Sequence, residues 1–148
     1  MHNTRNLPMK ILIMGLPGAG KTTLAEKLEH KLNVIWFNAD EIRNHINRDL
    51  GFTDADRIEQ ATRMGRLCDI VLRSKHVEHA MADFICPTQE TRQAFNADFT
   101  IWLDTIDEGR FADTNKVFQK PTFANLVIDS WDYDVDELVK LIQHYANN

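Results

Sequence analysis

A glycine-rich turn near the start of the chain constrains the fold more than any other feature of the sequence. Residues 15–22 read GLPGAGKT, which matches the pattern G-x-x-x-x-G-K-S/T. An apolar run at residues 10–14 precedes the turn, and residues 22–32 carry leucine and alanine at helical spacing after it. In this strand–turn–helix context, backbone N–H groups and the positive end of a helix enclose phosphate groups. The turn therefore predicts a site for a nucleoside triphosphate.

Each position in this phosphate loop has an expected role. Lys21 is expected to reach the β- and γ-phosphates, and the Thr22 hydroxyl to coordinate Mg²⁺. The predicted phosphate-binding residues are Gly15, Pro17, Gly18, Ala19, Gly20, Lys21, Thr22 and Thr23. ATP and Mg²⁺ are the cofactors that follow from this set.

Strand-like apolar runs alternate with helical segments along most of the chain. Expected strands cover residues 10–14, 34–37, 77–85, 99–103 and 126–128, and expected helices cover 22–32, 40–47, 54–75, 88–95 and 135–145. This order predicts an α/β protein with the three-layer P-loop kinase fold, in which a central, mainly parallel sheet has helices on both faces. Ligands of such sheets bind at the carboxyl ends of the strands. The loops after Met14, Phe37, Ile85 and Leu103 are therefore expected to converge on one site.

Length and composition limit the other classes of function. A chain of 148 residues suits a single domain, with residues 1–9 as a loose terminus. A net charge of −5 argues against a general nucleic-acid surface. The two cysteines lack zinc-site spacing, and the apolar runs are too short to span a membrane. These features predict a cytoplasmic protein without nucleic-acid or membrane partners.

The motifs that accompany the phosphate loop in switch GTPases are missing. None of the six glycines has an aspartate three residues before it, so there is no D-x-x-G motif. The only candidate for the guanine-selecting N-K-x-D motif, residues 115–118, has phenylalanine in the fourth position. A kinase is therefore the favoured class.

A second block of sequence suggests which kinase. Residues 38–63 read NADEIRNHINRDLGFTDADRIEQATR. This block is similar to the acceptor-binding block of adenylylsulfate (APS) kinases, which carries D-G-D-N-x-R, then G-L-N-x-D-L-G-F, then D-R-x-E-N-x-R-R. The phosphate loop resembles the family's GLSGAGKTT, and residues 84–87, Phe-Ile-Cys-Pro, resemble its F-I-S-P. The resemblance covers most of residues 10–131 and implies phosphorylation of the 3′-hydroxyl of adenylylsulfate by MgATP.

The resemblance favours a catalytic role for Asp40, together with Lys21. Asp40 follows the second strand, where a carboxylate can orient the acceptor hydroxyl, accept its proton or contact Mg²⁺ through water. Its alternative role is to cap the helix that follows. Asp83, near the end of another strand, could share the metal-ordering role or face solvent. The predicted metal set is Thr22, Asp40 and Asp83.

The acceptor site is expected to combine arginines with an aromatic ring. Guanidinium groups make paired charged hydrogen bonds to phosphate and sulfate, although a lone arginine more often lies on a solvated helix face. Phe52 could stack on the acceptor's adenine or pack in the core, and Asn47 could bind the acceptor or cap a turn. The full predicted set is Asp40, Arg43, Asn47, Phe52, Arg57, Gln60, Arg63 and Ile85.

The segment after Leu103 departs from the family pattern. APS kinases carry a long lid there with a D-P-K-G-L-Y-like stretch, whereas residues 104–122 are shorter and lack that motif. Arg110, Lys116 and Lys120 are the local cations that could close over the substrates, and the segment is expected to be mobile. Two alternatives therefore stay open. One is a kinase for another small anionic alcohol, such as a nucleotide or sugar phosphate, and the other is a nucleotide-binding module with little turnover. A homodimer is compatible with either.

Overall fold

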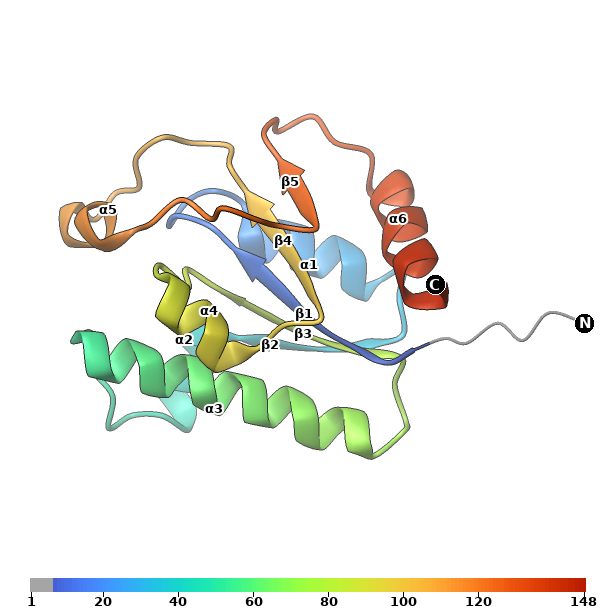
Figure 1. The fold of residues 1–148 in the computed structure, drawn as a ribbon, viewed down its shortest axis with the longest axis horizontal. Coiled ribbons are helices and arrows are strands. Elements are labelled where there is room, and N and C mark those ends of the chain that lie inside the picture. Colours follow the sequence, from blue (N-terminus) through green and yellow to red (C-terminus); the bar gives the residue numbers. More distant parts are fainter. Residues whose placement is uncertain (1–6) are drawn as a thin grey trace, which may run out of the picture.

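The computed structural model describes residues 7–148, which form a parallel sheet between two layers of helices (Figure 1). The strands are β1 (Met9–Met14), β2 (Val34–Asn38), β3 (His79–Phe84), β4 (Phe99–Leu103) and β5 (Leu126–Ile128). The helices are α1 (Lys21–Glu29), α2 (Ala39–His45), α3 (Asp54–Arg73), α4 (Gln89–Phe95), α5 (Ala112–Val117) and α6 (Val135–Asn147). The predicted fold class is confirmed. Residues 1–6 of the expected loose N-terminus lie outside the described residues, and the expectation is wrong for Met9, which is buried at the start of β1.

The order of the strands decides what each loop can reach. The sheet runs β2-β3-β1-β4-β5, and every neighbouring pair is parallel. The central strand β1 is buried along its whole length, as its unbroken apolar run predicted. The loop that follows β1 therefore lies at the middle of the sheet's carboxyl edge, with β2 and β5 at opposite ends.

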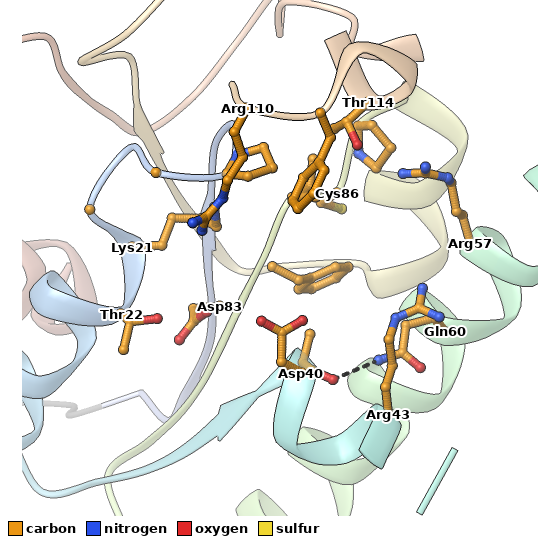
Figure 2. A pocket seen from close by; sticks show the side chains of 18 of the residues that line it. Lys21, Thr22, Asp40, Arg43, Arg57, Gln60, Asp83, Cys86, Arg110 and Thr114 are labelled. Carbon is orange, nitrogen blue, oxygen red and sulfur yellow. Dashed lines mark hydrogen bonds between the residues drawn. The ribbon is translucent and has the colours of Figure 1, made fainter. Parts of the chain in front are cut away.

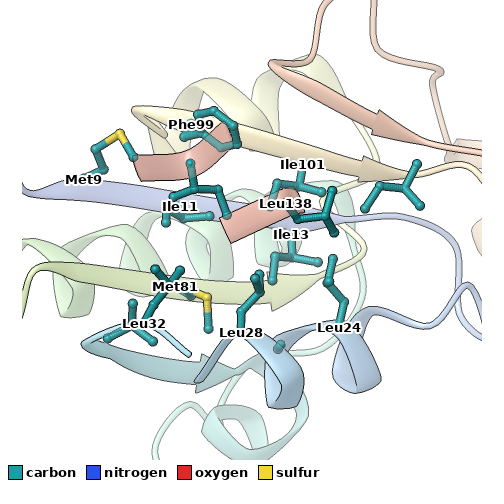
Figure 3. Close-up of a cluster of buried hydrophobic side chains, with 14 of the residues drawn as sticks. Met9, Ile11, Ile13, Leu24, Leu28, Leu32, Met81, Phe99, Ile101 and Leu138 are labelled. Carbon is teal, nitrogen blue, oxygen red and sulfur yellow. The ribbon is translucent and has the colours of Figure 1, made fainter. Parts of the chain in front are cut away.

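Alternate side chains of β1 enter two separate cores. Ile11 and Ile13 pack against α1 and α6 on one face of the sheet (Figure 3). Leu12 and Met14 pack on the other face, in the cluster to which α3 contributes Met64. This division follows from the two-residue period of a strand, and it fixes β1 and its loop from both sides.

Some element boundaries differ from those expected. Helix α3 ends at Arg73 because Lys75 adopts a left-handed conformation with φ of 61°. Residues 104–122, which were expected to lack periodic structure, contain the short helix α5. The Asn115 side chain accepts a hydrogen bond from the Gly109 N–H at 2.8 Å and donates one to the Gly109 carbonyl at 2.9 Å. These two hydrogen bonds link Gly109 to α5, and they leave no hydrophobic period in the sequence.

Within residues 7–148, no helix is both long enough and apolar enough to cross a bilayer.

Candidate active site

A cavity of about 890 Å³ opens at the carboxyl ends of the strands (Figure 2). Its walls come from the loops after β1, β2 and β3, from α3 and from the segment around α5. The expected convergence of loops is confirmed, because the loop after β4 also reaches the cavity, through Arg110 and Phe111. The start of this loop supports the phosphate loop, since the Thr105 hydroxyl donates a hydrogen bond to the Ala19 carbonyl at 2.7 Å.

The phosphate loop needs its glycines for two different reasons. A Cβ on Gly15 would lie 2.7 Å from the Leu103 carbonyl oxygen, so no larger residue fits there. Gly18 and Gly20 have φ of 89° and 100°, a left-handed conformation that side chains disfavour. Gly15 and Ala19 belong to the loop but do not line the cavity. The predicted phosphate-binding residues that do line it are Pro17, Gly18, Gly20, Lys21, Thr22 and Thr23.

Lys21 lies between the loop and two carboxylates. Its Nζ donates a hydrogen bond to the Leu16 carbonyl at 3.0 Å. Burial lowers the pKa of Lys21 to about 8, and the nearby carboxylates of Asp83 and Asp40 oppose this shift. The Lys21 side chain faces these carboxylates across the cavity (Figure 2).

Asp83 is buried and lines the cavity. Only 3% of the residue is exposed, which excludes the alternative that it faces solvent. Its Oδ2 accepts a hydrogen bond from Trp36 Nε1 at 2.7 Å, and its Oδ1 accepts one from Asn38 Nδ2 at 3.1 Å. Burial raises the pKa of Asp83, although these hydrogen bonds and Lys21 oppose the rise. The two β2 side chains thus fix the orientation of the carboxylate.

Asp40 is available for chemistry because a neighbour caps its helix. The N-cap of α2 is Asn38, whose Oδ1 accepts a hydrogen bond from the Glu41 N–H at 3.0 Å. The alternative role of Asp40 as the cap is therefore excluded. Its carboxylate points into the cavity, between the phosphate-loop side and the arginine side (Figure 2).

Phe52 and two arginines form a cluster at the far wall. The guanidinium carbons of Arg43 and Arg57 lie 4.5 Å and 5.7 Å from the centre of the Phe52 ring. The ring is 66% exposed, so the core-packing alternative is excluded. Arg43 donates a hydrogen bond to the Gly51 carbonyl at 2.8 Å, and Arg57 donates one to the Phe52 carbonyl at 3.0 Å. Neither arginine forms a salt bridge with any described residue, so both retain charge for an anion in the cavity.

Two predicted acceptor residues lie outside the cavity. Arg63 pairs with Asp49 at 2.8 Å and with Glu59 at 3.1 Å, one helical turn beyond the cavity wall. Asn47 is buried and donates a hydrogen bond to the Gln60 side chain at 2.8 Å. Gln60 itself reaches the cavity and donates a hydrogen bond to the Ala39 carbonyl at 3.4 Å (Figure 2). The structure thus gives Asn47 a supporting position and places Arg63 in a surface ion pair.

Comparison with known proteins relates this arrangement to a family. The family model for adenylylsulphate kinase matches residues 7–106. A bifunctional enzyme NodQ of Azospirillum brasilense is 34% identical over 134 residues, which are 82% of this chain and 21% of that protein. An adenylyl-sulfate kinase of Shewanella sp. (strain ANA-3) is 34% identical over 113 residues, which are 73% of this chain and 51% of that enzyme.

The chain belongs to the adenylylsulphate kinase family. Among solved structures, the APS kinase CysC of Mycobacterium tuberculosis has the same fold, with a TM-score of 0.75 at 20% identity, over 96% of this chain and 99% of that one. The chain spans a fifth to a half of the length of the two relatives above. The match to the adenylylsulphate kinase model ends at residue 106, close to the point where the lid-like segment begins.

The three lid candidates, Arg110, Lys116 and Lys120, lie in different places. Arg110 lines the cavity beside Lys21 (Figure 2). Lys116 instead lines a separate cleft of about 290 Å³, and Lys120 is exposed outside both cavities. Of the three cations proposed for closure, the structure brings only Arg110 to the site. Whether this segment moves stays a prediction.

The residues around the cavity suit a magnesium ion that is bound mainly by its substrate. Across residues 7–148, no group of three or more His, Cys, Asp or Glu side chains could hold a metal. Mg²⁺ commonly keeps several waters and binds through one or two carboxylates together with substrate phosphates. Thr22, Asp40 and Asp83 could supply such contacts, because all three line the cavity beside the phosphate loop (Figure 2).

Several cavity residues were missed in the sequence. Asn38, which caps α2 and orients Asp83 without lining the cavity, could have been found, because asparagine before an acidic first turn is a common helix cap. Phe84 belongs to the Phe-Ile-Cys-Pro stretch that resembles the family but was not assigned to the site. Phe111, Thr114 and Trp131 carry no local signal, since each reaches the cavity only through the order of the strands and the path of the segment around α5. Ile85, which was predicted, lines the cavity next to Cys86.

Proposed function

We propose that this chain transfers the γ-phosphoryl group of MgATP to the 3′-hydroxyl of adenylylsulfate, giving ADP and 3′-phosphoadenylylsulfate. The observation that carries this proposal is a single cavity in which Lys21 and Asp40 lie opposite the Arg43–Phe52–Arg57 cluster. An aromatic face and two guanidinium groups match an acceptor that joins an adenine to a phosphate–sulfate group. The CysC structure of Mycobacterium tuberculosis holds AMPPNP and APS, which supports the same pairing of substrates here.

The chain's own residues would divide the work of the transfer. The loop N–H groups and Lys21 hold the β- and γ-phosphates, while the cluster around Phe52 holds the acceptor. The acceptor oxygen bonds to the γ-phosphorus as the bond from that phosphorus to the β–γ bridging oxygen breaks, and ADP leaves with the electron pair. Asp40 orients the hydroxyl and takes its proton. Thr22 and Asp83 would help to hold Mg²⁺, which would supply charge neutralisation at the phosphate oxygens.

The lid segment motivates one further candidate acceptor. The match to the family model stops before Arg110 and α5, so this wall of the cavity lies outside the matched residues. A different small anionic alcohol, such as a nucleotide or sugar phosphate, would use the same phosphate loop and Asp40.

A panel of acceptors tests the proposal. The purified chain is incubated with ATP, Mg²⁺ and one acceptor at a time, and ADP formation is followed. The proposal expects ADP formation to depend on adenylylsulfate. Turnover with another alcohol but not with adenylylsulfate would select the alternative kinase. ATP binding without turnover on any acceptor would indicate a nucleotide-binding module.

Phe52 provides a specific test of the acceptor site. Removing the ring in Phe52→Ala is expected to raise the KM for adenylylsulfate by about 5- to 150-fold, the range for losing one base–aromatic stack. The KM for ATP should not change, because Phe52 lies on the wall opposite the phosphate loop. Steady-state kinetics with each substrate varied measures both effects, and Phe52→Tyr is the control that keeps a ring. An equal rise in both KM values would remove Phe52 from the acceptor site.

The lowered pKa of Lys21 predicts a pH dependence of ATP binding. Since the free amine titrates at about 8, its charge is lost as the pH rises through that value. Bound phosphates favour the ammonium form, so binding above that pH must take up a proton. ATP affinity should therefore fall at higher pH, with a slope approaching about tenfold per pH unit. Titration calorimetry in buffers of different ionisation enthalpy detects the proton, and a pH-independent affinity without proton uptake would contradict the assignment.

A further inference from the structure

A large exposed aromatic side chain lies against the phosphate loop on the side away from the acceptor cluster. Trp131 belongs to the connection between β5 and α6, is 59% exposed and lines the main cavity. A Cβ on Gly20 would lie 2.8 Å from the indole atom Cζ3. The six-membered part of the indole therefore rests on the backbone of the loop, while much of the ring stays open.

The connection that carries Trp131 is anchored to neighbouring elements. The Asp132 N–H donates a hydrogen bond to the Ser130 hydroxyl at 3.1 Å, which stabilises the turn around Trp131. Tyr133 packs against the core that includes α1, and the Lys27 ammonium lies 5.0 Å from the centre of its ring. The turn and the packing of Tyr133 thus position the backbone that carries the indole of Trp131.

The order of the strands sets the direction of a bound nucleotide. Lys21 faces Asp83, which lies near the end of β3, and Asp40, which comes just after β2. The γ-phosphate end of the nucleotide therefore points toward the β2–β3 half of the sheet. The phosphate loop follows the central strand β1, and Trp131 follows β5 at the opposite edge. A nucleotide whose γ-phosphate faces Asp40 must extend its nucleoside toward the β4–β5 half, where Trp131 lies.

We propose that the indole of Trp131 is the surface on which the base of the bound nucleoside triphosphate stacks. This inference rests on the proposed function only in placing the triphosphate in the loop. Base–aromatic stacking tolerates any base, because every base has a π face. Trp131 therefore distinguishes a nucleotide from a bare polyphosphate, and it favours adenine and guanine nucleotides alike.

Binding measurements without any acceptor test the role of Trp131. Affinities of the wild type and of Trp131→Ala are compared for three magnesium complexes, those of ATP, GTP and inorganic tripolyphosphate. The variant should lose about 5- to 150-fold in affinity for ATP and for GTP, and none for tripolyphosphate. Trp131→Phe should retain most of the affinity. Phe123→Ala, which truncates another exposed aromatic residue outside the cavity, should bind ATP as the wild type does.

Fluorescence provides an independent readout. Trp36 and Trp102 are only partly exposed, so stacking should quench mainly Trp131. ATP should quench the wild type, tripolyphosphate should not, and Trp131→Phe should lose the response.

Two results would overturn the inference. One is unchanged ATP affinity in Trp131→Ala, and the other is an equal loss for ATP and tripolyphosphate, which would mean that the indole only supports Gly20. Because no acceptor is present, a chain that binds ATP through Trp131 but does not phosphorylate adenylylsulfate would refute the proposed function alone. A wild type that binds no nucleotide would refute both.

Discussion

Asp40→Asn is expected to lower kcat by about 10²- to 10⁴-fold, the usual contribution of a positioned general base. The carboxylate points into the cavity and is not used as a helix cap, so the amide should preserve the local structure. ATP affinity should stay close to that of the wild type, because the phosphate loop is unchanged. Single-turnover kinetics together with direct ATP binding separates the two quantities.

A neighbouring carboxylate provides the matched control for Asp40. Glu41 lies on the same helix, is exposed and does not line the cavity. Glu41→Gln removes the same charge and should leave kcat unchanged. If Asp40→Asn turns over at the wild-type rate, or if both variants slow equally, Asp40 is not the base.

Lys21→Ala is expected to lose ATP binding as well as turnover. Truncating one partner of a buried charged contact costs about 2–5 kcal/mol, which is roughly 30- to 5,000-fold in affinity. The variant should be at least as stable as the wild type, because burial of the Lys21 amine disfavours its charged form. Titration calorimetry with MgATP and thermal unfolding measure the two effects.

Lys116→Ala is the control for this loss of positive charge. Lys116 lies outside the main cavity, in the smaller cleft, and its removal should leave ATP affinity unchanged. A comparable loss in both variants would mean that general electrostatic attraction holds the nucleotide. Loss of folding in Lys21→Ala would contradict the stability expected from its buried amine.

The phosphate loop could be predicted from sequence because its information is local. The glycines, Lys21 and the flanking strand and helix lie within two dozen residues, and conformation at Gly18 and Gly20 follows from residue type. The alternation of strands and helices likewise predicted the parallel sheet, since only a few topologies suit that order. The same alternation predicts that Asp40 follows the end of a strand, and in the structure it comes just after β2.

Other parts of the site depend on contacts that the sequence does not display. Residues 46–53 fold back on α3. This path brings Asp49 to Arg63, which it pairs with, and leaves the Phe52 ring exposed. Asp83 is oriented by Trp36 and Asn38, which become its neighbours only when β2 pairs with β3. Side-chain partners separated by this much sequence leave no periodic signal.

The lid-like segment, residues 104–122, also depends on contacts that the sequence does not display. Arg110 reaches the cavity because Gly109 is clamped by Asn115, and a Cβ on Gly109 would lie 3.0 Å from Cδ of Pro17. The sequence gives no reason to distinguish Arg110, Lys116 and Lys120 as lid cations. The path of the backbone brings Arg110 to the cavity and leaves both lysines outside it, so Arg110 is the one of the three that can close over the substrates.

The identity of the phosphorylated product tests the central claim most directly. The wild-type chain is incubated with γ-labelled ATP, Mg²⁺ and adenylylsulfate, and the labelled product is separated and its site of phosphorylation determined. The proposed activity predicts that label appears on the 3′-hydroxyl of adenylylsulfate, that Asp40→Asn forms this product far more slowly, and that Glu41→Gln forms it normally. Label that stays in ATP or appears only as inorganic phosphate, under conditions where the chain binds ATP, would contradict it.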